Sequence, residues 1–157
     1  MTAVSRTHLR KLTRLSPREW ADLIEAQLAL LVAQFRVWTR PTGRLVAHSS
    51  DAASESVERV PAVPPVPPRA EALALAVGRA AEFGVFRPLC LVRAVALNRV
   101  LERHGISGSR VRVGVRMRNG RFAAHAWVEY GDRVLGDNEA HVGSFVELSE
   151  VRLVDAR

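Results

Sequence analysis

The apolar residues of this 157-residue chain change their spacing once, at Gly105, and that change limits the folds open to it. Before Gly105, residues 71–83 and 90–104 carry apolar side chains at the three- and four-residue spacing of a helix. Gly84 directly follows the first of these segments, and a glycine is typical of a helix C-terminus. After Gly105 the spacing becomes two, which predicts a half-buried strand through Val111, Val113, Val115 and Met117.

Turn signals divide the rest of this half into further strands. Asn119-Gly120 is a strong hairpin signal, and residues 122–130 form the expected partner strand. Gly131-Asp132 is a second tight turn, and we expect strands at 133–136 and 145–148 after it. Helices followed by an antiparallel sheet predict an α+β fold.

A further helix is predicted near the N-terminus. Ser16 is a suitable N-cap, Pro17 suits the first helical position, and Glu19 completes a capping box. An apolar stripe at helical spacing follows and ends before Pro41: Trp20, Leu23, Ile24, Leu28, Leu31, Phe35 and Trp38. Because such stripes usually meet a core, we expect this helix to pack on the rest of the protein through the stripe. The alternative is a docking helix for a partner.

Residues 47–68 differ in composition from both flanks. Serines and acidic residues fill the first half, and Pro61-Ala62-Val63-Pro64-Pro65-Val66-Pro67-Pro68 ends the segment. This composition is typical of a linker that is stiff and extended in its second half. We therefore divide the chain into an N-terminal helical region (1–46), a Ser/Pro-rich linker (47–68) and an α+β domain (69–157).

Composition narrows the classes of function. The formal charge is +7, almost all of it from arginine, but the arginines are scattered and few aromatic residues lie among them. No zinc-finger, RNP or basic-helix signature is present, so we expect neither nucleic acid as a partner nor a metal site. No run of eighteen apolar residues and no secretory signal is present, which favours a cytoplasmic protein without stable membrane insertion.

Cys90 is the only cysteine, so it cannot form an internal disulfide. It follows a loop containing Pro88 and opens a predicted helix. The unpaired amides and the positive end of the helix dipole favour an anion there, and a thiolate is the nucleophilic form of cysteine. The alternative is an inert buried thiol.

His125 and Asp137 are the candidates to act with Cys90. His125 lies inside a predicted strand between two alanines, which allow another element to approach closely. Asp137 follows twelve residues later, and an antiparallel hairpin brings it back beside His125, where a carboxylate can accept the imidazole N–H. Taken singly, His125 can be a core residue and Asp137 a turn residue. Asp132 is a weaker rival, because it sits in the turn itself. Trp127 is equally consistent with the core and with a substrate-binding cleft.

Two stretches resemble known enzymes. The first is Cys90-Leu91-Val92-Arg93-Ala94-Val95-Ala96-Leu97-Asn98-Arg99-Val100-Leu101-Glu102-Arg103-His104-Gly105-Ile106; the second begins at Val111-Arg112-Val113-Gly114-Val115, reaches His125-Ala126-Trp127-Val128-Glu129 and continues to Asp137. Together they resemble transglutaminase-like cysteine proteases and, more narrowly, the stand-alone leader peptidases of lasso-peptide biosynthesis. The resemblance covers about residues 83–138 and implies a papain-like or transglutaminase-like core, a nucleophile helix packed on an antiparallel sheet.

This resemblance implies a function and partners. Cys90 would attack the carbonyl at the leader–core junction of a ribosomal precursor peptide, with His125 as base and Asp137 orienting it. The Cys90 backbone N–H would help to hold the oxyanion. A small leader-recognition protein would present the precursor, and a macrolactam-forming cyclase would use the product. Neither the motifs nor the resemblance implies a cofactor.

Two other functions remain open. The same triad can transfer an acyl group to an amine instead of water. A domain with this fold can also serve as a non-catalytic binding module in a biosynthetic complex.

Overall fold

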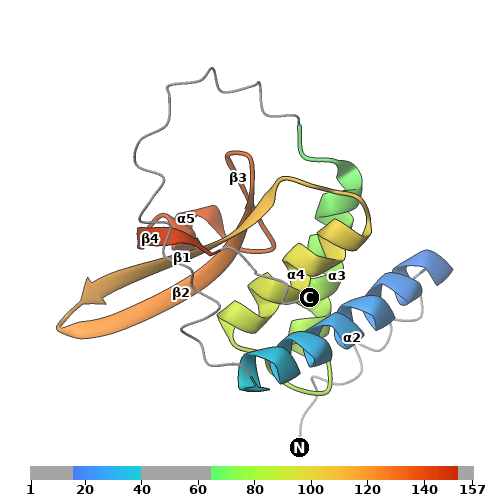
Figure 1. The fold of residues 1–157 in the computed structure, drawn as a ribbon, viewed down its shortest axis with the longest axis horizontal. Helices are drawn as coiled ribbons and strands as arrows, with labels where there is room; N and C mark the ends of the chain where they lie inside the picture. The colour runs from blue at the N-terminus through green and yellow to red at the C-terminus, as the bar shows by residue number, and fades with distance from the viewer. Residues whose placement is uncertain (1–15, 40–64, 152–157) are drawn as a thin grey trace, which may run out of the picture.

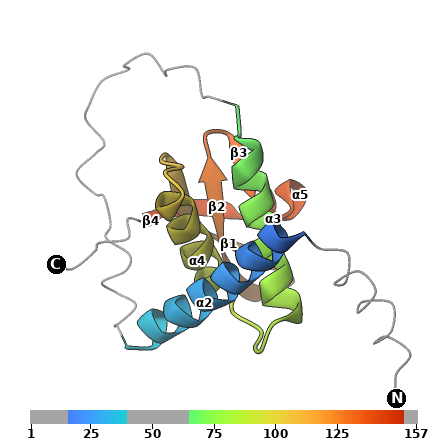
Figure 2. The ribbon, with the colours of Figure 1, turned by 90° about the vertical axis from the view of Figure 1, so that its right-hand side faces the viewer.

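The computed structural model describes residues 16–39 and 65–151, with side chains up to residue 148. Helix α2 (Pro17–Thr39) lies across helices α3 (Pro68–Phe83) and α4 (Cys90–Arg103), and these two helices cover one face of a four-stranded sheet (Figures 1 and 2). The predicted α+β fold is confirmed. Helix α4 occupies the middle position, in contact with α2, α3, β1 and β2.

The sheet is antiparallel and has the order β3-β2-β1-β4. Its elements are β1 (Ser109–Arg118), β2 (Arg121–Tyr130), β3 (Arg133–Leu135) and β4 (Val146–Val151), with the short helix α5 (Glu139–Val142) before β4. Strands β1 and β2 pair along their whole length around Asn119-Gly120, whose φ angles of 51° and 71° are those that a tight hairpin turn requires. The predicted hairpin is therefore confirmed.

The side chains of β2 divide between the two faces of the sheet. Ala126, Val128 and Tyr130 belong to the core that the strands share with the helices. Because successive strand residues point to opposite faces, His125 and Trp127 lie on the face turned away from α4. The candidate base thus projects from the face opposite the one covered by α4, the helix that carries the candidate nucleophile.

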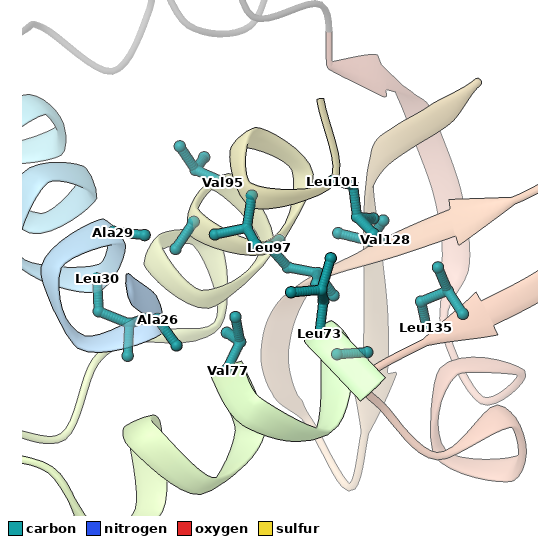
Figure 3. Close-up of a cluster of buried hydrophobic side chains, with 14 of the residues drawn as sticks. Ala26, Ala29, Leu30, Leu73, Val77, Val95, Leu97, Leu101, Val128 and Leu135 are labelled. Atoms are coloured by element: carbon teal, nitrogen blue, oxygen red, sulfur yellow. The ribbon is translucent and has the colours of Figure 1, made fainter. Parts of the chain in front are cut away.

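The core runs continuously through all three layers, as Figure 3 shows. Its largest fully buried side chains are Leu30, Leu73, Leu101, Val92, Val100, Val111 and Val128. Each such side chain stabilises the fold by roughly 1.5–3 kcal/mol relative to an exposed one. Alanines fill most of the remaining contacts of α2 and α3, so the helices approach one another closely.

Helix α2 begins as predicted, with Ser16 and Glu19 closing a reciprocal capping box: Ser16 N–H donates to Glu19 Oε2 (2.8 Å) and Glu19 N–H to Ser16 Oγ (3.3 Å). The face that packs is not the predicted one. Small residues and one leucine meet α3 and α4: Ala26, Ala29, Leu30 and Ala33. Six members of the predicted stripe are exposed, from 43% for Leu31 to 85% for Trp38, and Leu23 is half-buried.

The expectation that this helix packs on the domain is confirmed, but the apolar stripe is not the face that makes the contact. Close approach decided the contact, because the alanine face lets the helix axes come nearer than a face of tryptophan and phenylalanine allows. An ion pair supports the same orientation. Asp22, 8% exposed, accepts from both terminal nitrogens of Arg69 at 2.5 and 2.6 Å, which ties α2 to the first turn of α3. This hydrogen bonding holds the pKa of Asp22 below its ordinary value.

The predicted linker (47–68) falls mainly on residues 47–64, which lie outside the described residues, and its last residue, Pro68, begins α3. The division of the chain at residues 46 and 68 stays a prediction. Among the described helices, none is both long enough and apolar enough to cross a lipid bilayer.

Candidate active site

Cys90 is the first residue of α4, at the end of the loop that contains Pro88. The preceding residue, Leu89, caps the helix without a side-chain hydrogen bond, and its carbonyl accepts the N–H of Arg93 (3.1 Å). The first amides of the helix are therefore left for other acceptors. Cys90 is half-buried and lines a pocket. A thiolate here meets the positive end of the helix dipole.

His125 and Asp137 are in direct contact. The distance from His125 Nε2 to Asp137 Oδ2 is 2.7 Å, and the two side chains are 15% and 20% exposed. Asp137 Oδ1 accepts the backbone N–H of Asn138 at 2.7 Å, so both carboxylate oxygens are engaged. With Nε2–H donated to the carboxylate, the neutral imidazole keeps Nδ1 as the nitrogen that can take a proton. The arrangement suits an oriented general base.

The turn after β3 places Asp137. Strand β3 pairs with Val128–Tyr130 of β2 and ends at Leu135, so Asp137 lies just past the strand and not on it. Gly136 has φ of +72°, a conformation that a residue with Cβ rarely adopts, and a Cβ there would lie 3.1 Å from Leu97 Cδ2. Asp132 remains in the β2–β3 turn, beyond Tyr130, which is itself five residues or about 16 Å along β2 from His125 at 3.3 Å per residue. Of these two carboxylates, Asp137 is the one that reaches the histidine.

Cys90 and Asp137 line the same pocket, together with Trp127, Gly136 and Arg93. The pocket lies where β3 has ended, so residues 125–127 of β2 have no strand pairing on that side. No hydrogen bond joins Cys90 to His125 in the described part of the chain. Asp137 connects them, because it lines the Cys90 pocket and also contacts His125. In enzymes without bound substrate, catalytic hydrogen bonds are often long and tighten only in the complex.

Trp127 is 4% exposed, so it presents little open surface and packs beside His125. Its ring stacks near the imidazole, with centroids 6.2 Å apart, and its Nε1–H donates to Glu129 Oε1 at 2.8 Å. It also lines the Cys90 pocket. The two roles that the sequence left open, core and cleft, are thus both compatible with its position.

Three further residues surround the site and were not predicted from the sequence. His141 and Phe145 pack against His125 at centroid distances of 5.0 and 5.3 Å. Asn138, which caps α5 by accepting from Ala140 N–H and His141 N–H, sets their position. Asparagine is a favoured N-cap residue, so Asn138 is a local signal for the start of α5, whereas nothing local marks His141 or Phe145 as neighbours of His125. Within the described ranges, no three His, Cys, Asp or Glu side chains form a group that could hold a metal ion.

Arg93 links the nucleophile helix to the aspartate turn. It lies three residues after Cys90, on the same side of α4, and donates to the carbonyl of Gly136 at 3.4 Å. Because Gly136 precedes Asp137, this contact joins the two halves of the candidate site.

A helix-borne thiol shares its pocket with the aspartate of an oriented histidine–carboxylate pair. On an α+β scaffold, these three groups suit thiol-dependent acyl transfer. The chain matches the transglutaminase-like superfamily over residues 23–150 and belongs to that superfamily. Its members are generally cysteine peptidases or transferases, and membership indicates activity of that type here. No curated protein and no solved structure was found to match the chain.

Proposed function

We propose that this protein is a cysteine peptidase that removes the leader from a lasso-peptide precursor before macrolactam cyclisation. The observation that carries the proposal is the His125–Asp137 pair at 2.7 Å beside the pocket that holds Cys90. These are the three residues at which the sequence resembles the leader peptidases.

In the first half of the reaction, His125 Nδ1 takes the thiol proton and Cys90 Sγ attacks the carbonyl carbon of the scissile bond. The C–N bond breaks, the imidazolium returns its proton to the leaving amine, and the leader remains as a thioester. In the second half, His125 deprotonates water, which attacks the thioester and restores the thiol. Asp137 stabilises the imidazolium in both halves, and the Cys90 N–H stabilises the oxyanion.

A separate leader-recognition protein is proposed to deliver the precursor and to dock on the exposed apolar face of α2. Trp20, Ile24, Leu28, Leu31, Val32, Phe35 and Trp38 form this face and are 43–85% exposed. A single aromatic side chain buries roughly 150–250 Å². The seven side chains therefore offer an area on the order of the ~800 Å² that one partner gives to a standard interface. The macrolactam-forming cyclase is the proposed user of the freed amine.

The cytoplasm is the proposed location, because the precursor is made on ribosomes and a single catalytic thiol stays reduced there. The alternative function is transfer of the acyl group to an amine, which the superfamily match and the same three residues also accommodate. A non-catalytic binding role is the second alternative.

Peptide cleavage followed by mass spectrometry in ¹⁸O-water tests the proposal. The protein is mixed with the precursor and the leader-recognition protein encoded beside it. A single cut at the leader–core junction that places ¹⁸O on the new carboxyl group supports hydrolysis, and its loss in Cys90→Ala and His125→Ala assigns the residues. An amide product instead supports acyl transfer. No product from the wild type, with the partner bound, contradicts both enzyme functions.

A further inference from the structure

A second pocket adjoins the Cys90 pocket and is rich in arginine. Arg79, Arg87 and Arg93 line it, together with the apolar Leu75, Ala81 and Pro88. Gly78 and Arg93 line both pockets, so the two pockets are neighbours. The arginines come from three elements: α3, the α3–α4 loop and α4.

The three guanidinium groups have little local neutralisation. Arg79 reaches Glu19 only at 4.0 Å, and its side chain is 41% exposed. Arg93 donates to one backbone carbonyl at a long 3.4 Å, which leaves most of its five N–H donors unused. Arg87 is exposed and makes no ion pair with any described residue. Among the described lining residues Glu82 is the one acidic side chain, so this part of the lining carries a net positive charge.

We propose that this pocket binds an acidic side chain of the peptide substrate, close to the scissile bond. The inference rests on the proposed function, since it requires that a peptide occupy the Cys90 pocket. Guanidinium groups bind carboxylates in a planar, two-pronged geometry that ammonium groups do not offer. Apolar walls beside them suit the methylene stem of Asp or Glu.

The position of Arg93 limits which substrate residue is held. Arg93 and Cys90 are one helical turn apart, about 5–6 Å between Cβ atoms. An extended peptide advances about 3.3 Å per residue. A carboxylate held by Arg93 and Arg87 therefore belongs to a residue within about three positions of the bond that Cys90 attacks. Single-stranded nucleic acid is a poorer fit, because none of the described residues that line the pocket is an aromatic residue on which a base can stack.

Binding of fluorescent peptides to full-length Cys90→Ala protein, measured by anisotropy, tests the inference without requiring cleavage. The peptides span the leader–core junction, and each Asp or Glu is replaced in turn by Asn or Gln. We expect one replacement within three positions of the junction to weaken binding about 5- to 20-fold. Arg87→Gln in the Cys90→Ala protein should weaken binding of the unmodified peptide by the same factor. It should not further weaken binding of the peptide that already lacks the selected carboxylate.

Arg121→Gln is the matched control, because it removes one positive charge beside the turn of the β1–β2 hairpin, at a residue that does not line the pocket. Charge reversal gives a second measure: Arg87→Glu should restore binding of a peptide with Lys at the selected position. The inference is overturned if no single replacement matters, or if Arg121→Gln weakens binding as much as Arg87→Gln. Peptides that bind but are never cleaved by the wild type would contradict the proposed function and leave the acid-binding pocket intact.

Discussion

Gly114 lies directly opposite His125 in the β1–β2 pairing, on the face of the sheet that carries the imidazole. Its missing side chain leaves the space that Trp127 and Phe145 fill. A Cβ at this position would lie 2.8 Å from Trp127 Cη2 and 3.0 Å from Phe145 Cβ. Both rings also contact His125, so the glycine controls the packing around the candidate base.

Gly114→Ala is expected to lower the free energy of unfolding by about 1–3 kcal/mol, because overpacking forces both rings to move. Urea unfolding measures the loss, and peptide cleavage should fall with it as His125 shifts. Gly78→Ala is the control, since a Cβ on that helical glycine meets nothing within 4 Å. It should leave stability unchanged or raise it by up to about 1 kcal/mol. Equal stability of Gly114→Ala and wild type would contradict the steric account.

Asp137→Asn is expected to lower kcat by about 10²–10⁴-fold, because an amide neither fixes the tautomer nor stabilises the imidazolium. The fold should persist, since the substitution keeps the shape of the side chain. Steady-state cleavage and circular dichroism measure the two effects. Asp132→Asn, in the β2–β3 turn, is the matched control and should keep nearly full activity. If Asp132→Asn lowered kcat more than Asp137→Asn, the orienting role would belong to Asp132.

The two faces of α2 should respond differently to truncation. Leu30→Ala removes a fully buried side chain and should destabilise the protein by about 2–5 kcal/mol. Phe35→Ala, at a position 65% exposed, should change stability by no more than about 0.5 kcal/mol. Thermal or urea unfolding compares them. A large loss of stability from Phe35→Ala would mean that the predicted stripe packs after all.

Phe35→Ala and Trp38→Ala should also weaken binding of the leader-recognition protein, by tenfold or more if these residues are central to the interface. Titration calorimetry with the purified partner measures the affinity. Sedimentation of the protein alone shows whether a second copy occupies the face instead. Unchanged partner affinity in both variants would exclude this face as the docking surface.

The Asp22–Arg69 ion pair should make stability depend on pH. Hydrogen bonding to Arg69 lowers the pKa of Asp22 in the folded state below its ordinary value of 3.8. The ionised form is therefore favoured by folding, so the stabilisation is fully present above pH 3.8 and is lost as the pH falls through the folded-state pKa.

Asp22→Asn removes this pH-dependent stabilisation and leaves the partly buried Arg69 guanidinium without its charged partner. We expect the free energy of unfolding to fall by about 1–3 kcal/mol at pH 7. This loss is smaller than for a fully buried pair because the Arg69 side chain is 26% exposed. Urea unfolding of both proteins at a series of pH values measures this. The difference in their free energies of unfolding should shrink as the pH becomes more acidic. A difference that stays constant with pH would show that the carboxylate charge does not contribute.

The sequence by itself determined the local structure and the order of the chemical groups. The period change at Gly105, the Asn119-Gly120 turn and the Ser16–Glu19 capping box predicted elements that the structure confirms, because spacing and turn chemistry act between near neighbours. The twelve-residue separation of His125 and Asp137, across one reversal of the chain, was short enough for the contact itself to be predicted.

Tertiary structure alone decided three other matters. It chose the alanine face of α2 over the more apolar stripe, since packing rewards close approach as well as hydrophobicity. It placed Cys90 and His125 on opposite sides of β2 and joined them through the turn at Asp137, a relation that depends on where β3 ends. It gathered Arg79, Arg87 and Arg93 into one pocket. Contacts between separate elements follow from how whole surfaces fit, and no local pattern in the chain encodes that fit.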